Sequence, residues 1–239
     1  MVLAAGLGTR LRPLTDDRPK ALVEVAGRTL LEITLARLRA FGITEVVVNV
    51  HHFAEMVVDY LAANNNFGMR TEISREEELL DTGGGLKKAA WFFLEQDAEK
   101  DQPFLLHNVD VLSTIDLARM AQFHRERNAL ATLAVQSRPT SRPLLFDKNG
   151  QLIGRGRGDE KGKEFALAFS GIHIISPRIF AMMPEQDAFS IIDAYVRLAA
   201  QREAITAFPA DKFYWRDLGK PEAITQAARD MESGVYSAQ

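Results

Sequence analysis

The chain has 239 residues, of which 46% are hydrophobic and 26% charged, and its net charge is −3. This composition suits a globular α/β protein and gives no basic field of the kind that nucleic-acid or anionic-membrane binding needs, so we expect neither partner. The absence of cysteine excludes disulfides, thiolate metal sites and cysteine nucleophiles. No run approaches the ~18 apolar residues of a membrane helix, and we expect a cytoplasmic protein.

The first half of the chain alternates predicted strands with predicted helices. Apolar or β-branched runs predict strands over residues 2–5, 46–50, 69–74 and 104–107. Helical spacing of apolar residues predicts helices over 30–41, capped by Thr29, over 53–61, and over 86–94 after the glycines at 83–85. This alternation is typical of a doubly wound, Rossmann-like sheet, mixed but mostly parallel, with helices on its faces.

The second half adds a β elaboration to this pattern. We expect a helix capped by Asp116 and running to about 127, strands over 130–136, 165–175 and 204–208, and helices over 177–183, 189–201 and 221–232. Asn149-Gly150 between two apolar runs predicts a hairpin, and the charged segment 154–163 is expected to be a mobile surface loop. No linker divides the chain, so we expect one domain.

The segment after the first strand has the composition of a phosphate-binding loop. Glycines allow close backbone approach, and cations donate to oxyanions; the segment combines Gly6 and Gly8 with Arg10, Arg12, Arg18 and Lys20. The third glycine of the dinucleotide fingerprint is replaced by Leu11, and Pro13 and Pro19 argue against a long helix here. Asp110 follows another predicted strand, at the edge where α/β sheets bind ligands.

Five motifs in this order resemble those of sugar-1-phosphate nucleotidyltransferases. They are LAAGLGTRLRPLT with PKALVEVAG (residues 3–15 and 19–27), DTGGG (81–85), NVDV (108–111), FSGI (169–172) and WRDLG (215–219). The chain is most similar to the short members that activate N-acetylmuramic acid 1-phosphate with UTP, which implies nucleotide-sugar biosynthesis and peptidoglycan recycling. Val109 departs from the pattern, because many relatives carry a small residue there.

The resemblance implies a nucleotide-binding part over about 1–115 and a sugar-binding part over about 116–239, and it implies a role for each motif. Arg10, Lys20 and Asp110 would be catalytic, and Asp110 with Asp217 would hold Mg²⁺. The sugar 1-phosphate would contact Lys20, Ser170, Gly171 and Asp217. The nucleoside triphosphate would contact Leu3, Ala4, Ala5, Gly6, Gly8, Thr9, Arg10, Thr82, Gly83, Gly84 and Asn108.

Other functions stay open at this point. Guanylyltransferases of mannose 1-phosphate or heptose 1-phosphate share much of the pattern. A non-catalytic nucleotide-sugar sensor on the same fold would be expected to lack one of the cations or carboxylates, which are all present here. The fourth and fifth motifs, FSGI and WRDLG, favour a sugar phosphate over phosphocholine or a molybdenum cofactor. The sequence leaves a monomer and a small homo-oligomer equally open, and His51-His52 is interpreted as a strand-end turn.

Overall fold

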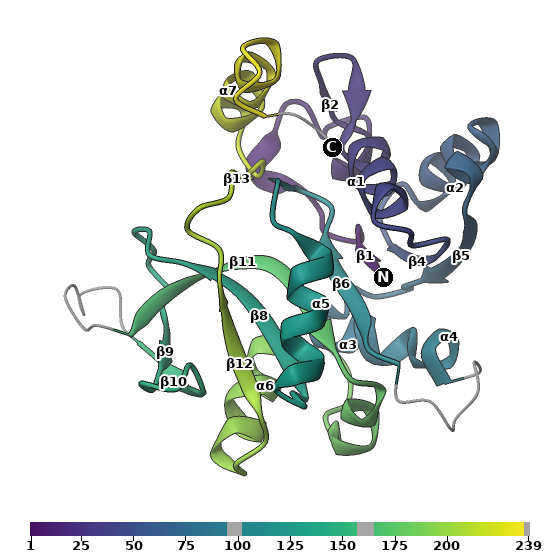
Figure 1. Cartoon of the computed structure of the whole chain (residues 1–239). Coiled ribbons are helices and arrows are strands. Elements are labelled where there is room, and N and C mark those ends of the chain that lie inside the picture. Colours follow the sequence, from purple (N-terminus) through teal and green to yellow (C-terminus); the bar gives the residue numbers. More distant parts are fainter. Residues whose placement is uncertain (95–101, 157–164, 237–239) are drawn as a thin grey trace. The chain divides into compact units, whose positions relative to one another are not determined.

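The computed structural model of the chain describes residues 1–94, 102–156 and 165–236 (Figure 1). Its contacts divide the chain into two compact units. Unit 1 comprises Met1–Leu79, His107–Ile115 and Phe213–Gln239, and unit 2 comprises Leu80–Leu106 and Asp116–Lys212. The expected division into parts over 1–115 and 116–239 stays a prediction, and most of the charged segment 154–163 lies outside the described residues.

A parallel sheet forms the centre of unit 1. Its strand order is β6-β1-β4-β5, and His107 and Asn108 of β6 pair with Val2 and Leu3 of β1. The strands are β1 (Val2–Leu3), β4 (Glu45–Val50), β5 (Arg70–Arg75) and β6 (Phe104–Asn108), whose first residues belong to unit 2. The central strands β1 and β4 are apolar runs that are buried on both faces, apart from the half-buried Glu45 at the start of β4, as expected for the middle of a parallel sheet.

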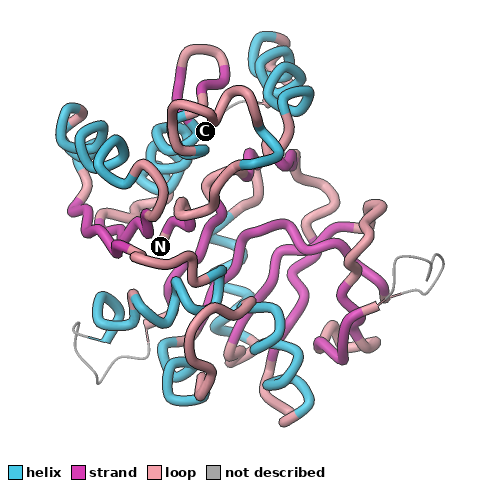
Figure 2. Tube along the Cα trace, turned by 180° about the vertical axis from the view of Figure 1, so that it is seen from behind, coloured by secondary structure: helices cyan, strands magenta, loops and turns pink. Residues whose placement is uncertain are grey.

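Helices α1 (Leu30–Ala40) and α2 (Ala54–Ala63) cover one face of these strands (Figures 1 and 2). Thr29 caps α1 as predicted, since its hydroxyl accepts the amide of Glu32 at 3.0 Å. The segments between these elements form short 3-10 helices at Thr9–Leu11, Lys20–Leu22 and Asn65–Gly68 and the antiparallel pair β2 (Glu24–Val25) and β3 (Arg28–Thr29). Unit 1 is completed by β7 (Val111–Ser113), β13 (Trp215–Asp217) and α7 (Pro221–Glu232).

Unit 2 is built on a mainly antiparallel sheet. The strand order is β10-β9-β11-β8-β12, in which only β8 and β12 are parallel. The strands are β8 (Ala131–Gln136), β9 (Leu144–Phe146), β10 (Leu152–Arg155), β11 (Ala166–Ile175) and β12 (Ile205–Pro209). The predicted hairpin is β9–β10, closed by the amide of Gly150 donating to the carbonyl of Asp147 at 2.9 Å.

The helices of unit 2 pack on this sheet. Asp116 caps α5 (Leu117–Glu126) as predicted, and α5 contacts β8 and β11. Helix α6 (Ile191–Ala200) contacts β10 and β12, while α3 (Asp81–Lys88), α4 (Ala90–Leu94) and the 3-10 helix Pro177–Met182 complete the unit. The predicted α/β class is confirmed, as a mixed and mostly parallel sheet flanked by helices.

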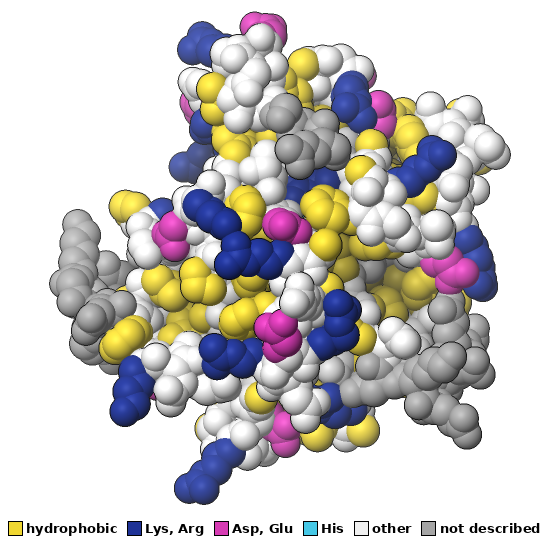
Figure 3. All heavy atoms as spheres, viewed as in Figure 1, with side chains coloured by type: hydrophobic (Ala, Val, Ile, Leu, Met, Phe, Trp, Pro, Cys, Tyr) yellow, Lys and Arg dark blue, Asp and Glu magenta, His cyan; other side chains and the backbone are white. Residues whose placement is uncertain are grey.

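The surface carries no block of one charge on the face shown in Figure 3, where basic and acidic side chains are interspersed. Within the described ranges, no helix is long and apolar enough to cross a membrane. His51, whose Nδ1 lies 2.9 Å from the carbonyl oxygen of Glu76, forms part of the turn after β4, as the sequence predicted.

Candidate active site

The loop after β1 turns at Gly8 in a conformation that only glycine adopts easily. Gly8 has φ 66° and ψ 21°, and its carbonyl accepts the amide of Leu11 at 2.8 Å and the hydroxyl of Thr15 at 2.9 Å. A Cβ at this position would lie 2.9 Å from Thr15 Cγ2 and 3.2 Å from Lys20 Cβ. Both the backbone and the packing therefore require glycine, and the loop is fixed while Gly6, Thr9 and Arg10 stay exposed.

The residues before this loop are interior rather than exposed. Leu3, Ala4 and Ala5 are buried, and the amide of Ala4 donates to Asn49 Oδ1 at 2.7 Å. Asn49 is fixed in turn by donating to Glu76 Oε1 at 2.7 Å. The predicted contact of Leu3, Ala4 and Ala5 with nucleotide stays a prediction, and it would have to use groups other than the Ala4 amide.

Lys20 and Asp110 form a largely buried ion pair beside the glycine loop. Lys20 begins a 3-10 helix, and its Nζ lies 2.9 Å from Asp110 Oδ2, with only 15% and 11% of the two side chains exposed. A Cβ at Gly6 would lie 3.6 Å from Lys20 Nζ, so the ammonium group lies against the loop. The structure thus brings three of the predicted site residues, Gly6, Lys20 and Asp110, to one place.

Asp217 is placed next to Asp110 by the antiparallel pair β7–β13. Asp217 is opposite Val111 in the register, and the amide of Leu218 donates to the Asp110 carbonyl at 2.8 Å. These pairings bring two carboxylates, 107 residues apart in the sequence, to neighbouring backbone positions. Asp217 is exposed, and its Oδ1 accepts the amide of Gly219 at 2.6 Å.

Arg10 and Asp217 lie on either side of the same small space above Gly219. A Cβ at residue 219 would lie 2.5 Å from Arg10 Nη2 and 2.7 Å from Asp217 Oδ1. Gly219 is buried, although Asp217 and Lys220 beside it are exposed. Arg10, Lys20, Asp110 and Asp217 therefore all belong to unit 1 and form one charged site at the end of its parallel strands.

The two aspartates fit a magnesium ion that is completed by substrate. Among the residues that the structure describes, no group of three or more His, Asp or Glu side chains could hold a metal ion. Mg²⁺ is typically bound by one or two carboxylates and takes its other oxygens from water and phosphate. The exposed Asp217 and the largely buried Asp110, beside a cationic loop, match a site in which two carboxylates bind the ion and water and phosphate supply the other oxygens.

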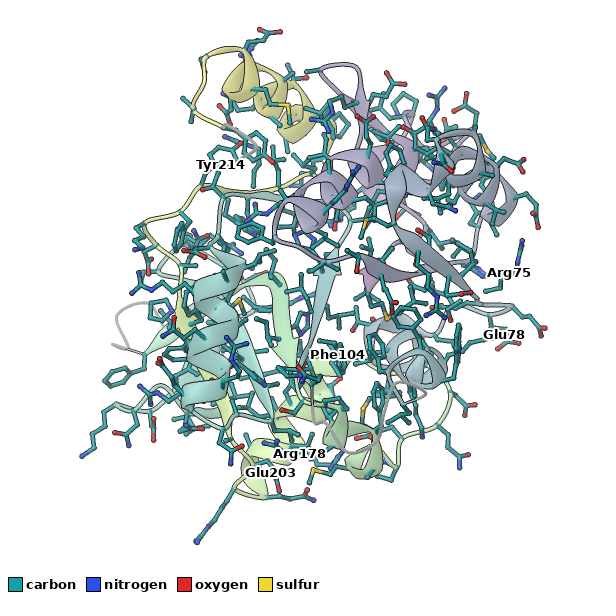
Figure 4. The ribbon with its side chains drawn as sticks, turned by 45° about the vertical axis from the view of Figure 1, so that its right-hand side comes forward. Arg75, Glu78, Phe104, Arg178, Glu203 and Tyr214 are labelled. Atoms are coloured by element: carbon teal, nitrogen blue, oxygen red, sulfur yellow. The ribbon has the colours of Figure 1, made fainter. Side chains whose placement is uncertain are left out.

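Buried contacts fix the strands that carry these carboxylates. Arg37 of α1 donates to Ser113 Oγ at 3.1 Å and also to the carbonyl of Ile115, just beyond β7. On the β13 side, the hydroxyl of Tyr214 donates to Asp230 Oδ2 of α7 at 2.5 Å (Tyr214 is labelled in Figure 4). Burial of Tyr214 and its bond to Asp230 raise its pKa to about 12.

The motif DTGGG lies in unit 2 and differs from the expected structure. Helix α3 begins at Asp81 rather than near Leu86, so the glycines form its first turns. The reason is packing: Gly83 donates to the carbonyl of Phe189 at 2.8 Å, and a Cβ at Gly83 would overlap the Phe189 ring. A Cβ at Gly84 would lie 2.5 Å from the carbonyl oxygen of Asp187.

The other residues predicted to contact substrate lie within the packed structure of their own units. The hydroxyl of Thr82 accepts the amide of Ile191 at 3.0 Å, which ties α3 to α6. Ser170 and Gly171 are buried where the β11–β8 register shifts, and Gly171 has φ 72°. Asn108 ends β6 and is half-buried in unit 1. Contact of Thr82, Gly83, Gly84, Ser170, Gly171 and Asn108 with substrate stays a prediction.

Sequence reasoning did not single out Arg37, Asn49 or Thr15, and gave no role to Gly219. Arg37 is recognisable in retrospect as a cation on the apolar stripe of α1, three residues after the buried Thr34. Asn49, Thr15 and Gly219 act through backbone geometry or short polar contacts, and such contacts leave no recognisable pattern in the sequence.

The chain belongs to the nucleotidyl transferase family, whose model matches residues 1–234. It is 36% identical to the N-acetylmuramate alpha-1-phosphate uridylyltransferase of Caulobacter vibrioides, over 93% of this chain and 92% of that protein. It is also 30% identical to the mannose-1-phosphate guanyltransferase of Yarrowia lipolytica, over 93% of this chain but only 61% of that longer protein. The predicted resemblance and the predicted enzyme class, a nucleotidyltransferase, are confirmed.

Solved structures share the fold. HddC from Yersinia pseudotuberculosis matches with a TM-score of 0.78 and 24% identity over 96% of this chain and 97% of that one. The inositol-1-phosphate CTP transferase of T. maritima matches with a TM-score of 0.76 and 17% identity over 99% of this chain and 96% of that one. At these identities the likeness establishes the fold alone.

Proposed function

We propose that the protein transfers a nucleoside monophosphate from UTP to N-acetylmuramic acid 1-phosphate and releases pyrophosphate. The observation that carries this proposal is the charged site of unit 1, in which Lys20 and Asp110 pair at 2.9 Å and Arg10 lies beside Asp217. The choice of UTP and of this sugar is supported by the 36% identity to a uridylyltransferase that spans nearly the whole of both chains.

The reaction needs two anions to be brought together without a covalent intermediate. An oxygen of the sugar phosphate attacks the α-phosphorus of the triphosphate, a new P–O bond forms, and the bond to pyrophosphate breaks. Catalysis of this kind depends on positioning and on stabilising negative charge. Arg10 would stabilise the β- and γ-phosphates and the departing pyrophosphate, and Lys20 would neutralise charge between the α-phosphate and the incoming phosphate.

The loop supplies the remaining contacts to the triphosphate. Gly6 and Thr9 are exposed at the end of β1, and their backbone amides would face the phosphates, while Gly8 fixes the turn. Asp110 and Asp217 would hold Mg²⁺, which supplies charge neutralisation at the phosphate oxygens when bound. Ser170 and Gly171 of unit 2 are proposed to contact the sugar, and Thr82, Gly83 and Gly84 the base and ribose.

A guanylyltransferase is the second candidate. The 30% identity to a mannose-1-phosphate guanyltransferase supports it, since the same phosphate chemistry serves either base. A nucleotide-sugar sensor is less favoured, because Arg10, Lys20, Asp110 and Asp217 are all retained.

A substrate panel tests the proposal. Release of pyrophosphate is measured with each of the four nucleoside triphosphates against N-acetylmuramic acid, glucose and mannose 1-phosphates, with and without Mg²⁺. We expect Mg²⁺-dependent turnover that is fastest with UTP and N-acetylmuramic acid 1-phosphate. Fastest turnover with GTP and mannose 1-phosphate would establish the second candidate, and no turnover with any pair would refute the enzymatic proposal.

Two variants then test the metal ligands. Asp110→Asn and Asp217→Asn keep the size of the side chain but remove the charge, and each should lower turnover by at least about 1,000-fold while the protein stays folded. Asp211→Asn removes an exposed aspartate of unit 2 and serves as the control, with turnover near that of the unmodified protein. Near-normal turnover in either site variant would remove that residue from the metal site.

A further inference from the structure

We propose that Gly219 is a positioning residue, which keeps free the space that Arg10 and Asp217 share. The inference rests on the proposed function, since it assigns those two side chains to triphosphate and metal. Neither the family resemblance nor the fold gives Gly219 a role of this kind. The proposal comes from what a side chain at residue 219 would meet.

The space above Gly219 is bounded by functional atoms. An added Cβ would lie 2.5 Å from Arg10 Nη2, 3.0 Å from Arg10 Cζ and 2.7 Å from Asp217 Oδ1. Carbon atoms do not approach oxygen or nitrogen so closely without repulsion, so any side chain must displace Arg10, Asp217 or both. No core residue is among these nearest atoms.

Backbone strain does not explain this glycine. Gly8 and Gly171 have φ values of 66° and 72°, which favour glycine, whereas Gly219 is absent from the residues with positive φ. A side chain at 219 is therefore compatible with the backbone. Its cost falls on the positions of Arg10 and Asp217 rather than on the fold.

The turn at residues 217–219 couples the two side chains. The amide of Gly219 donates to Asp217 Oδ1 at 2.6 Å, so this oxygen is held against the backbone. Leu218 is buried, and its amide donates to the Asp110 carbonyl at 2.8 Å, which fixes the turn to the other carboxylate. Gly219 cannot move away from Arg10 without disturbing both bonds. The 2.5 Å contact would be relieved by movement of the exposed Arg10 side chain, and the 2.7 Å contact by a shift of Asp217 Oδ1.

The variant Gly219→Ala separates this role from a structural one. We expect its thermal unfolding midpoint to stay within about 2 °C of the parent, while the dissociation constant of UTP, measured by calorimetry without metal, rises at least about tenfold. That of UMP should change less than about twofold, because UMP has no β- or γ-phosphate for Arg10 to contact. Gly154→Ala is the matched control, since residue 154 has open space around its Cβ position and should bind both nucleotides normally.

A double-mutant cycle tests whether the effect passes through Arg10. In an Arg10→Ala background, Gly219→Ala should weaken UTP binding by less than about twofold, because the displaced group is already gone. Equal losses for UTP and UMP, or an unfolding midpoint lowered as far as in the strained variant Gly8→Ala, would overturn the inference. Unchanged UTP binding in Gly219→Ala would do the same. If the parent shows no turnover in the substrate panel, the proposed function fails, whereas these binding ratios are read independently of turnover.

Discussion

Lys20 Nζ lies 2.9 Å from Asp110 Oδ2, so the ammonium group occupies a position at the carboxylate that a cation would otherwise take. Both side chains are largely shielded from water, which strengthens the Coulomb attraction between them relative to an exposed pair. A metal ion that binds Asp110 has to share this carboxylate with Lys20 or move it. The same lysine would thus hold the carboxylate in place before substrate binds and neutralise phosphate afterwards.

Replacing Lys20 should therefore strengthen metal binding while it weakens catalysis. In Lys20→Met, we expect Mn²⁺, titrated without nucleotide and followed by electron paramagnetic resonance, to bind about tenfold more tightly, because a like charge near the metal is removed. Turnover should fall at least about 100-fold. Arg70→Met, which removes an exposed cation of β5 paired with Glu45 at 3.4 Å, is the control and should leave both quantities near their original values. Weaker or unchanged Mn²⁺ binding in Lys20→Met would contradict the competition.

The Arg37→Lys variant should show how far the carboxylates depend on buried support. Arg37 reaches these two acceptors with different nitrogens of its planar fork, which a single ammonium group does not reproduce, and the weakened bonding should lower the free energy of unfolding by about 1–3 kcal/mol. Because β7 carries this support towards Asp110, the dissociation constant of Mn²⁺ should also rise several-fold at a temperature where the variant is fully folded. Arg39→Lys is the control: the exposed Arg39 donates to the Phe67 carbonyl, and its loss should change stability by less than about 0.5 kcal/mol. Unaltered metal binding in Arg37→Lys would limit its role to stability.

Acid should destabilise the protein partly through His107. Burial, with the nearby positive charge of Arg37 as a further cause, lowers the pKa of His107 from 6.5 to about 3. Below pH 6.5, His107 binds a proton in the unfolded chain but stays neutral in the folded chain until the pH approaches about 3. The contribution of His107 to the free energy of unfolding is therefore fully present above pH 6.5. It is lost as the pH falls towards about 3, at up to ~1.4 kcal/mol per pH unit.

Urea unfolding between pH 7.5 and 4.5 measures this dependence. His107→Asn keeps a donor for the neighbouring Asn108 carbonyl but does not titrate, so its stability should be lower at pH 7.5 and fall less steeply towards acid. The exposed His52 provides the control, since His52→Asn should leave the slope unchanged. An identical slope for the parent protein and His107→Asn would show that other groups cause the acid sensitivity.

Gly83→Ala should destabilise the fold of unit 2. The added methyl group would overlap the Phe189 ring and lie 2.8 Å from its carbonyl oxygen, at a cost of about 1–3 kcal/mol in chemical unfolding. Gly154→Ala, with open space at its Cβ position, should stay within about 0.5 kcal/mol of the parent. A neutral Gly83→Ala would mean that α3 can shift away from Phe189, and it would leave substrate contact as the explanation for this glycine.

Local chemistry made much of the fold predictable from the sequence. Thr29 and Asp116 each supply a side-chain acceptor where a helix begins, and both helices start there. Asn149-Gly150 between apolar runs specified the hairpin of unit 2. In each case the decisive contact lies within a few residues along the chain, and such contacts leave a pattern in the sequence.

Contacts between distant residues were not predictable in the same way. The convergence of Asp110 and Asp217 was expected only from the family resemblance, and the pairing of Lys20 with Asp110 was not predicted, because no spacing rule relates residues 90 or more positions apart. The start of α3 was misjudged because three glycines disfavour a helix in isolation, and only the packing of Phe189 and Asp187 explains them. The role of Gly219 could be recognised only from the positions of the Arg10 and Asp217 side chains in the structure.

The antiparallel pairing of β7 with β13 has a consequence for the order in which the site is completed during synthesis. Residues 215–217 are translated long after residues 111–113. Asp217 can therefore join Asp110 only when nearly all of the described chain has been made. A chain that is terminated between residues 114 and 214 contains the cationic loop and Asp110 but lacks the second carboxylate. Such a fragment has one of the two proposed metal ligands and lacks β13 and α7 of unit 1, so premature termination should abolish Mg²⁺-dependent turnover even where the whole cationic loop has been made.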